Sequence, residues 1–206
     1  MNTTDTAIIE NPYKTPDARV ADAEERLSPT LFYVVAPRKF LLLMIGTFGL
    51  YSIYWFYENW ALLNRKHKAY WPVARGIFSI FFAHSLFAEV DRVIRGSDPP
   101  RKFSWSPSTL ATIYVVSSLI SNICDRLSMK DIGSPVTDLL PLAMLVPTVL
   151  VLYRAQHAIN FAEGDPDGAR NRTLTAANIF WLVLGAVWWL LILVGTYITL
   201  FDPDIQ

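Results

Sequence analysis

Residues 176–201 read AANIFWLVLGAVWWLLILVGTYITLF, and this stretch decides the fold class. It runs for 26 residues without a charged side chain. A helix of about 20 apolar residues is long enough to cross the hydrocarbon core of a bilayer. Gly185 lies between the tryptophans of this stretch, where a small residue lets another helix approach closely. We therefore predict a membrane-spanning α-helix at residues 176–201.

Four further apolar segments precede this helix, and polar residues separate them. They cover residues 40–57, 73–90, 110–124 and 136–153. Charged residues make up only 17% of the chain, against about a quarter in an average soluble domain. The sequence therefore predicts an all-α integral membrane bundle of five hydrophobic helices within residues 31–206. A disordered polar tail is expected at residues 1–30, because it is rich in charged and turn-forming residues.

The number of spans depends on residues 73–90. This segment carries Arg75, His84 and Glu89 among phenylalanines and isoleucines, and the two charges near its ends can reach the membrane interface. Five spans are expected if it crosses the bilayer, and four if it forms a re-entrant or surface helix. Counting lysines and arginines in the loops does not separate these two topologies. The last residues carry neither, so we expect the C-terminus outside the cytoplasm.

Composition and motifs argue against several classes of function. The formal net charge is zero, so no basic surface is predicted to bind nucleic acid. The single Cys124 leaves no partner for an intrachain disulfide or a cysteine-based zinc site. Glu163, Asp165 and Asp167 lack the spacing of a calcium-binding EF-hand and are expected in a solvated turn. The chain is accordingly predicted to be no enzyme, with no catalytic residue, cofactor or metal.

Arg75, His84 and Glu89 are the candidate residues for a polar pathway through the membrane. Ionisable groups inside apolar segments often serve transport. Two other interpretations stay open. His84 can be neutral and hydrogen-bonded to a neighbouring helix, and Arg75 and Glu89 can act as anchors at the two ends of their segment.

A dense aromatic motif accompanies the first segment. Its residues are Thr47, Gly49, Tyr51, Tyr54, Trp55, Tyr57, Asn59 and Trp60, entered through Lys39 and Phe40. These side chains are typical of a helix-packing or interface motif, either an aromatic belt or a lipid or cation site. The pattern Lys-Phe, Thr-x-Gly-x-Tyr, Tyr-Trp-x-Tyr and Asn-Trp resembles a group of uncharacterised bacterial multi-pass membrane proteins. The resemblance implies a bacterial inner-membrane location and no assigned activity.

Two functions are compatible with these patterns. The first is a non-enzymatic accessory or scaffold component that associates with lipid, with other membrane proteins or with itself. The glycine and aromatic surfaces of the first and last segments favour it. The alternative is a small transporter or channel that uses Arg75, His84 and Glu89.

Overall fold

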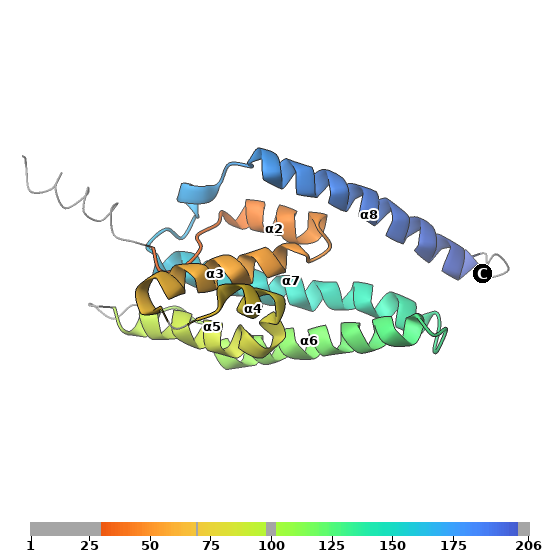
Figure 1. Ribbon diagram of the computed structural model, residues 1–206, viewed down its shortest axis with the longest axis horizontal. Helices are drawn as coiled ribbons and strands as arrows, with labels where there is room; N and C mark the ends of the chain where they lie inside the picture. Colours follow the sequence, from red (N-terminus) through yellow and green to blue (C-terminus); the bar gives the residue numbers. More distant parts are fainter. Residues whose placement is uncertain (1–29, 69, 98–101, 202–206) are drawn as a thin grey trace, which may run out of the picture. The chain divides into compact units, whose positions relative to one another are not determined.

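The computed structural model describes residues 30–68, 70–97 and 102–201 (Figure 1). The predicted disordered tail lies outside these ranges, apart from Thr30. Within them the chain contains helices and no strand. The helices are α2 (Pro37–Gly46), α3 (Tyr51–His67), α4 (Pro72–Ile77), α5 (Ser79–Arg95), α6 (Pro107–Ser128), α7 (Val136–Ala162), the short 3₁₀ helix η1 (Ala169–Asn171) and α8 (Ala176–Phe201). The all-α fold class is thus confirmed for the described residues.

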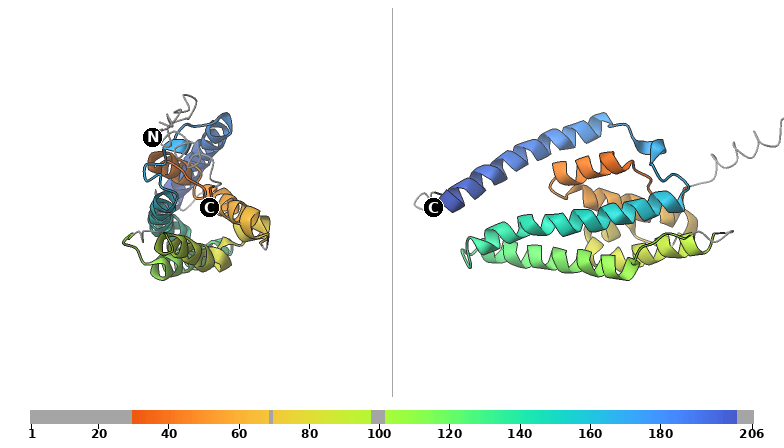
Figure 2. Two further views of the ribbon diagram at one scale, coloured as in Figure 1. Left: turned by 90° about the vertical axis from the view of Figure 1, so that its left-hand side faces the viewer. Right: turned by 180° about the vertical axis from the view of Figure 1, so that it is seen from behind.

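Three helices, α6, α7 and α8, are long and apolar enough to cross a membrane. They contain the last three predicted segments, and α8 coincides with residues 176–201. α6 and α7 run antiparallel beside each other (Figure 2). α7 continues through Pro141 and Pro147. The prediction of five such helices is wrong for the described residues, because the first two apolar segments are each broken into shorter pieces.

Residues 40–57 do not form one helix, because the chain reverses between Gly46 and Tyr51. Phe48 and Gly49 both adopt positive φ angles, 53° and 79°, which end α2. The Thr47 hydroxyl accepts the backbone N–H of Tyr51 at 3.0 Å and so begins α3. Figure 1 shows α3 returning beside α2, which makes the predicted first span a helical hairpin.

Residues 73–90 are broken at Phe78, whose φ and ψ of −96° and 39° lie outside the helical region. α4 is therefore only six residues long. It packs closely on α3, since a Cβ added at Gly76 would lie 3.0 Å from the Tyr57 Cβ. The α2–α3 turn and the α4–α5 junction both lie partway along α6, α7 and α8 (Figures 1 and 2). Hydropathy alone does not register these backbone reversals.

α8 meets the rest of the chain at one close crossing with α2. A Cβ added at Gly185 would lie only 1.8 Å from the carbonyl oxygen of Gly46, so this crossing requires glycine. The Trp189 indole donates a hydrogen bond of 2.7 Å to the Ile45 carbonyl, and its ring packs edge-on against Phe48. Only 6% of the apolar stretch that makes α8 a candidate membrane span is buried, against 22% of the corresponding stretch in each of α6 and α7.

Candidate functional site

A network of polar side chains holds an extended segment, residues 31–36, which we call the strap. Most of its residues are buried, yet it belongs to no helix or sheet. Buried backbone groups need hydrogen-bond partners, and here side chains supply them. Phe32, Val34, Val35 and Ala36 are each less than 9% exposed. The strap is therefore fixed by polar side chains from other parts of the chain.

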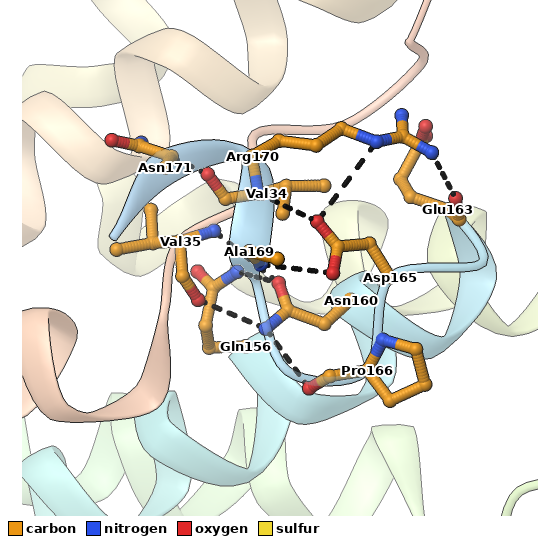
Figure 3. Close-up of polar contacts among 10 residues, drawn as sticks. All are labelled: Val34, Val35, Gln156, Asn160, Glu163, Asp165, Pro166, Ala169, Arg170 and Asn171. Atoms are coloured by element: carbon orange, nitrogen blue, oxygen red, sulfur yellow. Dashed lines mark hydrogen bonds and ion pairs between the residues drawn. The ribbon is translucent and has the colours of Figure 1, made fainter. Parts of the chain in front are cut away.

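α7 and Glu163, the residue that directly follows it, supply the main set of these side chains, with Gln156 and Asn160 from α7 itself (Figure 3). Their spacing of four and three residues places them on one face of the helix. The Asn160 amide binds both backbone groups of Val35, accepting its N–H at 3.3 Å and donating to its carbonyl at 2.9 Å. Gln156 donates to the Tyr33 carbonyl at 3.1 Å and to the Asn160 Oδ1 at 2.7 Å.

The Glu163 carboxyl closes the N-terminal end of the strap. Its Oε1 accepts the backbone N–H groups of Leu31 and Phe32, both at 2.9 Å. Burial raises the pKa of Glu163, while the two N–H groups and Arg170 oppose that shift. This end of the strap is therefore sensitive to the ionisation of one carboxyl group.

The connection between α7 and α8 wraps around the other side of the strap. The Asp165 carboxylate accepts the backbone N–H groups of Ala169 and Arg170 at 2.9 and 3.0 Å, which fixes η1 (Figure 3). Gly168 has a φ of 64°, and a Cβ there would lie 2.5 Å from the Val35 carbonyl carbon. Only glycine therefore allows the connection to lie against the strap.

Asn171 and Lys39 complete this side of the site. The Asn171 amide donates to the Val34 carbonyl at 2.9 Å, and its backbone carbonyl accepts the Ala36 N–H at 3.2 Å. The Lys39 ammonium donates to the Asn171 Oδ1 at 2.6 Å and to the Thr173 carbonyl at 2.8 Å. Burial lowers the pKa of Lys39.

Two motif residues of α3 join the same network. Asn59 is fully buried, accepts the Tyr33 N–H at 3.0 Å and donates to the Trp55 carbonyl at 2.8 Å. The Trp55 indole donates to the Gln156 Oε1. The network thus links α3, α7 and the α7–α8 connection through the strap. Its amide groups are all hydrogen-bonded, so this arrangement fixes the strap against the helices.

The other residues of the aromatic motif have separate places. Thr47 and Gly49 form the α2–α3 reversal, and Tyr51 packs edge-on against Phe40 in the core with ring centroids 6.0 Å apart. Tyr54 and Tyr57 are more exposed. Thr47, Tyr51, Tyr54 and Tyr57 help to line an apolar cavity of about 570 Å³, together with Val73 and Ile77 of α4 and Trp181 of α8.

Trp60 belongs to a cage around Arg75. The guanidinium carbon of Arg75 lies 4.2 Å from the Trp60 ring centroid, 4.4 Å from that of Tyr70 and 4.7 Å from that of Phe82. These distances are those of cation–π contacts. The cage is formed by side chains from α3, α5 and the connection before α4.

The structure does not bring the three candidate pathway residues together. Arg75 lies in its aromatic cage on α4, whereas His84 and Glu89 lie on α5. The His84 Nε2 is exposed and lies 3.1 Å from the Thr112 hydroxyl of α6. Glu89 forms an ion pair with Arg92 on its own helix. Each of the three therefore has a different set of neighbours.

Sequence reasoning missed Gln156, Asn160, Glu163 and Asn171 as parts of one site. A signal was present for the first three, because they form a polar stripe on a largely apolar helix. Asn171 gave no such signal, since its role depends on how the α7–α8 connection folds. In the described part of the chain, no group of three or more His, Cys, Asp and Glu side chains could hold a metal ion.

Comparison with known proteins adds no further assignment. No family model, no curated protein and no solved structure matches this chain.

Proposed function

We propose that this protein is a non-enzymatic accessory or scaffold component of a membrane, which associates with other membrane proteins or with lipid. The exposure of α8 carries this proposal. α8 is a long apolar helix whose contact with the chain centres on the Gly46–Gly185 crossing, and most of its surface is left for other partners. Exposed apolar side chains extend along it and include Leu184, Leu191 and Trp188.

The proposal includes a topology in which only α6, α7 and α8 cross the membrane. α2–α3 and α4–α5 then enter from one side and return to it. That side then holds both ends of each hairpin and the α7–α8 connection. Of the 18 lysines and arginines, only Arg126 and Lys130 lie near the α6–α7 connection on the opposite side. By the positive-inside rule the basic side is cytoplasmic, and the C-terminus is on the opposite side.

The location follows from this topology and from the family resemblance. We assign the protein to a bacterial inner membrane, with the N-terminal tail in the cytoplasm and the C-terminus in the periplasm. The strap supports a scaffold role, because its buried hydrogen bonds tie the start of the membrane domain firmly to α7. The transport alternative has weaker support, since Arg75, His84 and Glu89 have separate neighbours.

Cross-linking from α8 tests the proposal. Leu191→Cys places a thiol on the exposed face of α8, and Val116→Cys places one on an exposed face of α6; both variants carry Cys124→Ser. Native membranes are treated with a membrane-permeant bis-maleimide, and adducts are identified by mass spectrometry. The proposal expects a discrete adduct with a second copy or one identified membrane protein from α8 and not from α6. Monomer only, together with purified protein that retains no lipid, would contradict it.

A further inference from the structure

We propose that Arg75 and its aromatic cage bind the phosphate group of an anionic phospholipid. The cage holds the guanidinium between Trp60, Tyr70 and Phe82, with its central carbon within 4.7 Å of each ring centroid. The guanidinium carbon lies over each of the three rings, so cation–π contacts hold the group in place. The cage therefore positions Arg75 without using its hydrogen bonds.

The guanidinium N–H donors have no acceptor within the described residues. The Arg75 guanidinium takes part in none of the hydrogen bonds or ion pairs found there. Trp60 is fully buried, and its indole N–H also lacks an acceptor among the described residues. Two donors without an acceptor among the described residues, the guanidinium of Arg75 and the indole N–H of Trp60, thus belong to one cage. An unpaired guanidinium beside apolar groups is unfavourable, so an anion from outside the chain is the natural partner.

The surroundings of the cage indicate that the anion belongs to a lipid. The neighbouring surface of α4 and the start of α5 is apolar and exposed, as expected where a protein meets acyl chains. Its side chains include Trp71, Val73, Ile77, Phe78 and Phe81, which are between 56% and 82% exposed. A phospholipid whose phosphate is bound at Arg75 would cover these apolar side chains with its acyl chains.

Charge favours the same ligand. The end of α3 and the residue that follows it carry Arg65, Lys66 and Lys68, all of them exposed. Basic residues next to a membrane surface attract anionic lipids. A guanidinium fork also matches two oxygens of a phosphate, which an ammonium group cannot do. This inference deepens the lipid part of the proposed function, but Leu191 on α8 is no part of the cage, so loss of lipid binding at Arg75 would leave the α8 cross-link unchanged and the two failures are distinguishable.

Native mass spectrometry of the full chain in a neutral detergent tests the inference. The probes are short-chain phosphatidylglycerol, short-chain phosphatidylcholine and inorganic phosphate. We expect one phosphatidylglycerol to bind more tightly than phosphatidylcholine, and Arg75→Gln to weaken it at least about tenfold, as for loss of a charge-assisted hydrogen bond. The matched control Arg92→Gln removes an exposed arginine and should leave the affinity unchanged.

Arg75→Lys separates the lipid site from a purely structural role. It keeps the charge but loses the planar fork, so we expect a folded protein with clearly weaker phosphatidylglycerol binding. Circular dichroism and gel filtration report folding, and this variant decides the question if Arg75→Gln misfolds. Unchanged affinity in Arg75→Lys and Arg75→Gln, or equal weakening in Arg92→Gln, would overturn the inference. Displacement of the lipid by inorganic phosphate would assign the site to a free anion instead.

Discussion

Removal of the Asn160 amide gives the sharpest test of how the strap is held. Asn160 is fully buried and is the hydrogen-bond partner of both the Val35 N–H and the Val35 carbonyl. Asn160→Ala leaves these two backbone groups without a partner. An unsatisfied buried polar group costs about 1–3 kcal/mol, so the free energy of strap detachment should fall by roughly 2–6 kcal/mol.

Proteolysis measures this detachment directly. Chymotrypsin cleaves after aromatic residues and can reach Phe32 and Tyr33 only when the strap has detached. Because each 1.4 kcal/mol is a factor of ten, cleavage in Asn160→Ala should be roughly 30-fold to 10⁴-fold faster when the strap reattaches faster than it is cut. Mass spectrometry identifies the fragments that begin at Tyr33 or Val34, and circular dichroism shows whether the helices remain folded.

Asn122→Ala provides the matched control. The Asn122 amide is exposed and donates only to the Ser118 carbonyl one turn back in α6, so its removal should change stability by less than about 0.5 kcal/mol. A cleavage rate in Asn160→Ala within threefold of the wild type would refute the reasoning. It would mean that the buried amide does not hold the strap.

Three further predictions concern α8, Glu163 and His84. Gly185→Val should destabilise the protein by about 1–3 kcal/mol in thermal unfolding, because α8 must move away from α2. The control Gly195→Val should not destabilise it, because an added Cβ there meets no atom within 4 Å. Equal effects of the two substitutions would contradict the close crossing of α8 and α2. The raised pKa of Glu163 means that the folded state binds this proton more tightly, so strap attachment should weaken as the pH rises from 4.5 through the raised pKa. Glu163→Gln keeps the acceptor oxygen and should abolish this pH dependence of chymotrypsin cleavage, whereas a dependence that persists would assign it to another group. His84→Phe should leave folding and α8 cross-linking unchanged, since it removes one exposed hydrogen bond; loss of the cross-link in a folded variant would argue against this account.

Part of this fold could be predicted from the sequence, because long apolar runs have few alternatives. Residues 176–201 form one helix as predicted, and Ser106-Pro107 begins α6 as proline at the first helical position should. The first two segments were misjudged because their composition fits a span. Their backbone reverses at Phe48–Gly49 and breaks at Phe78, and these local conformations leave little trace in hydropathy.

The polar site was harder to predict, since most of the contacts to the strap join residues more than 100 positions apart in the chain. Val35 and Asn160 meet only because α7 packs beside the strap. The stripe of Gln156, Asn160 and Glu163 is visible in the sequence and was missed, and the sequence alone does not show what it binds. The aromatic motif was visible as a pattern, but its residues divide among the reversal, the strap and the Arg75 cage.

Thiol labelling in intact cells tests the proposed three-span topology most directly. Lys66→Cys reports the end of α3, and Met129→Cys, which is 85% exposed, reports the α6–α7 connection; both carry Cys124→Ser. A membrane-impermeant maleimide should label Met129→Cys from outside and Lys66→Cys only after lysis. Labelling of Lys66→Cys in intact cells would place the end of α3 outside, and the two hairpins with their shared cytoplasmic side would have to be abandoned.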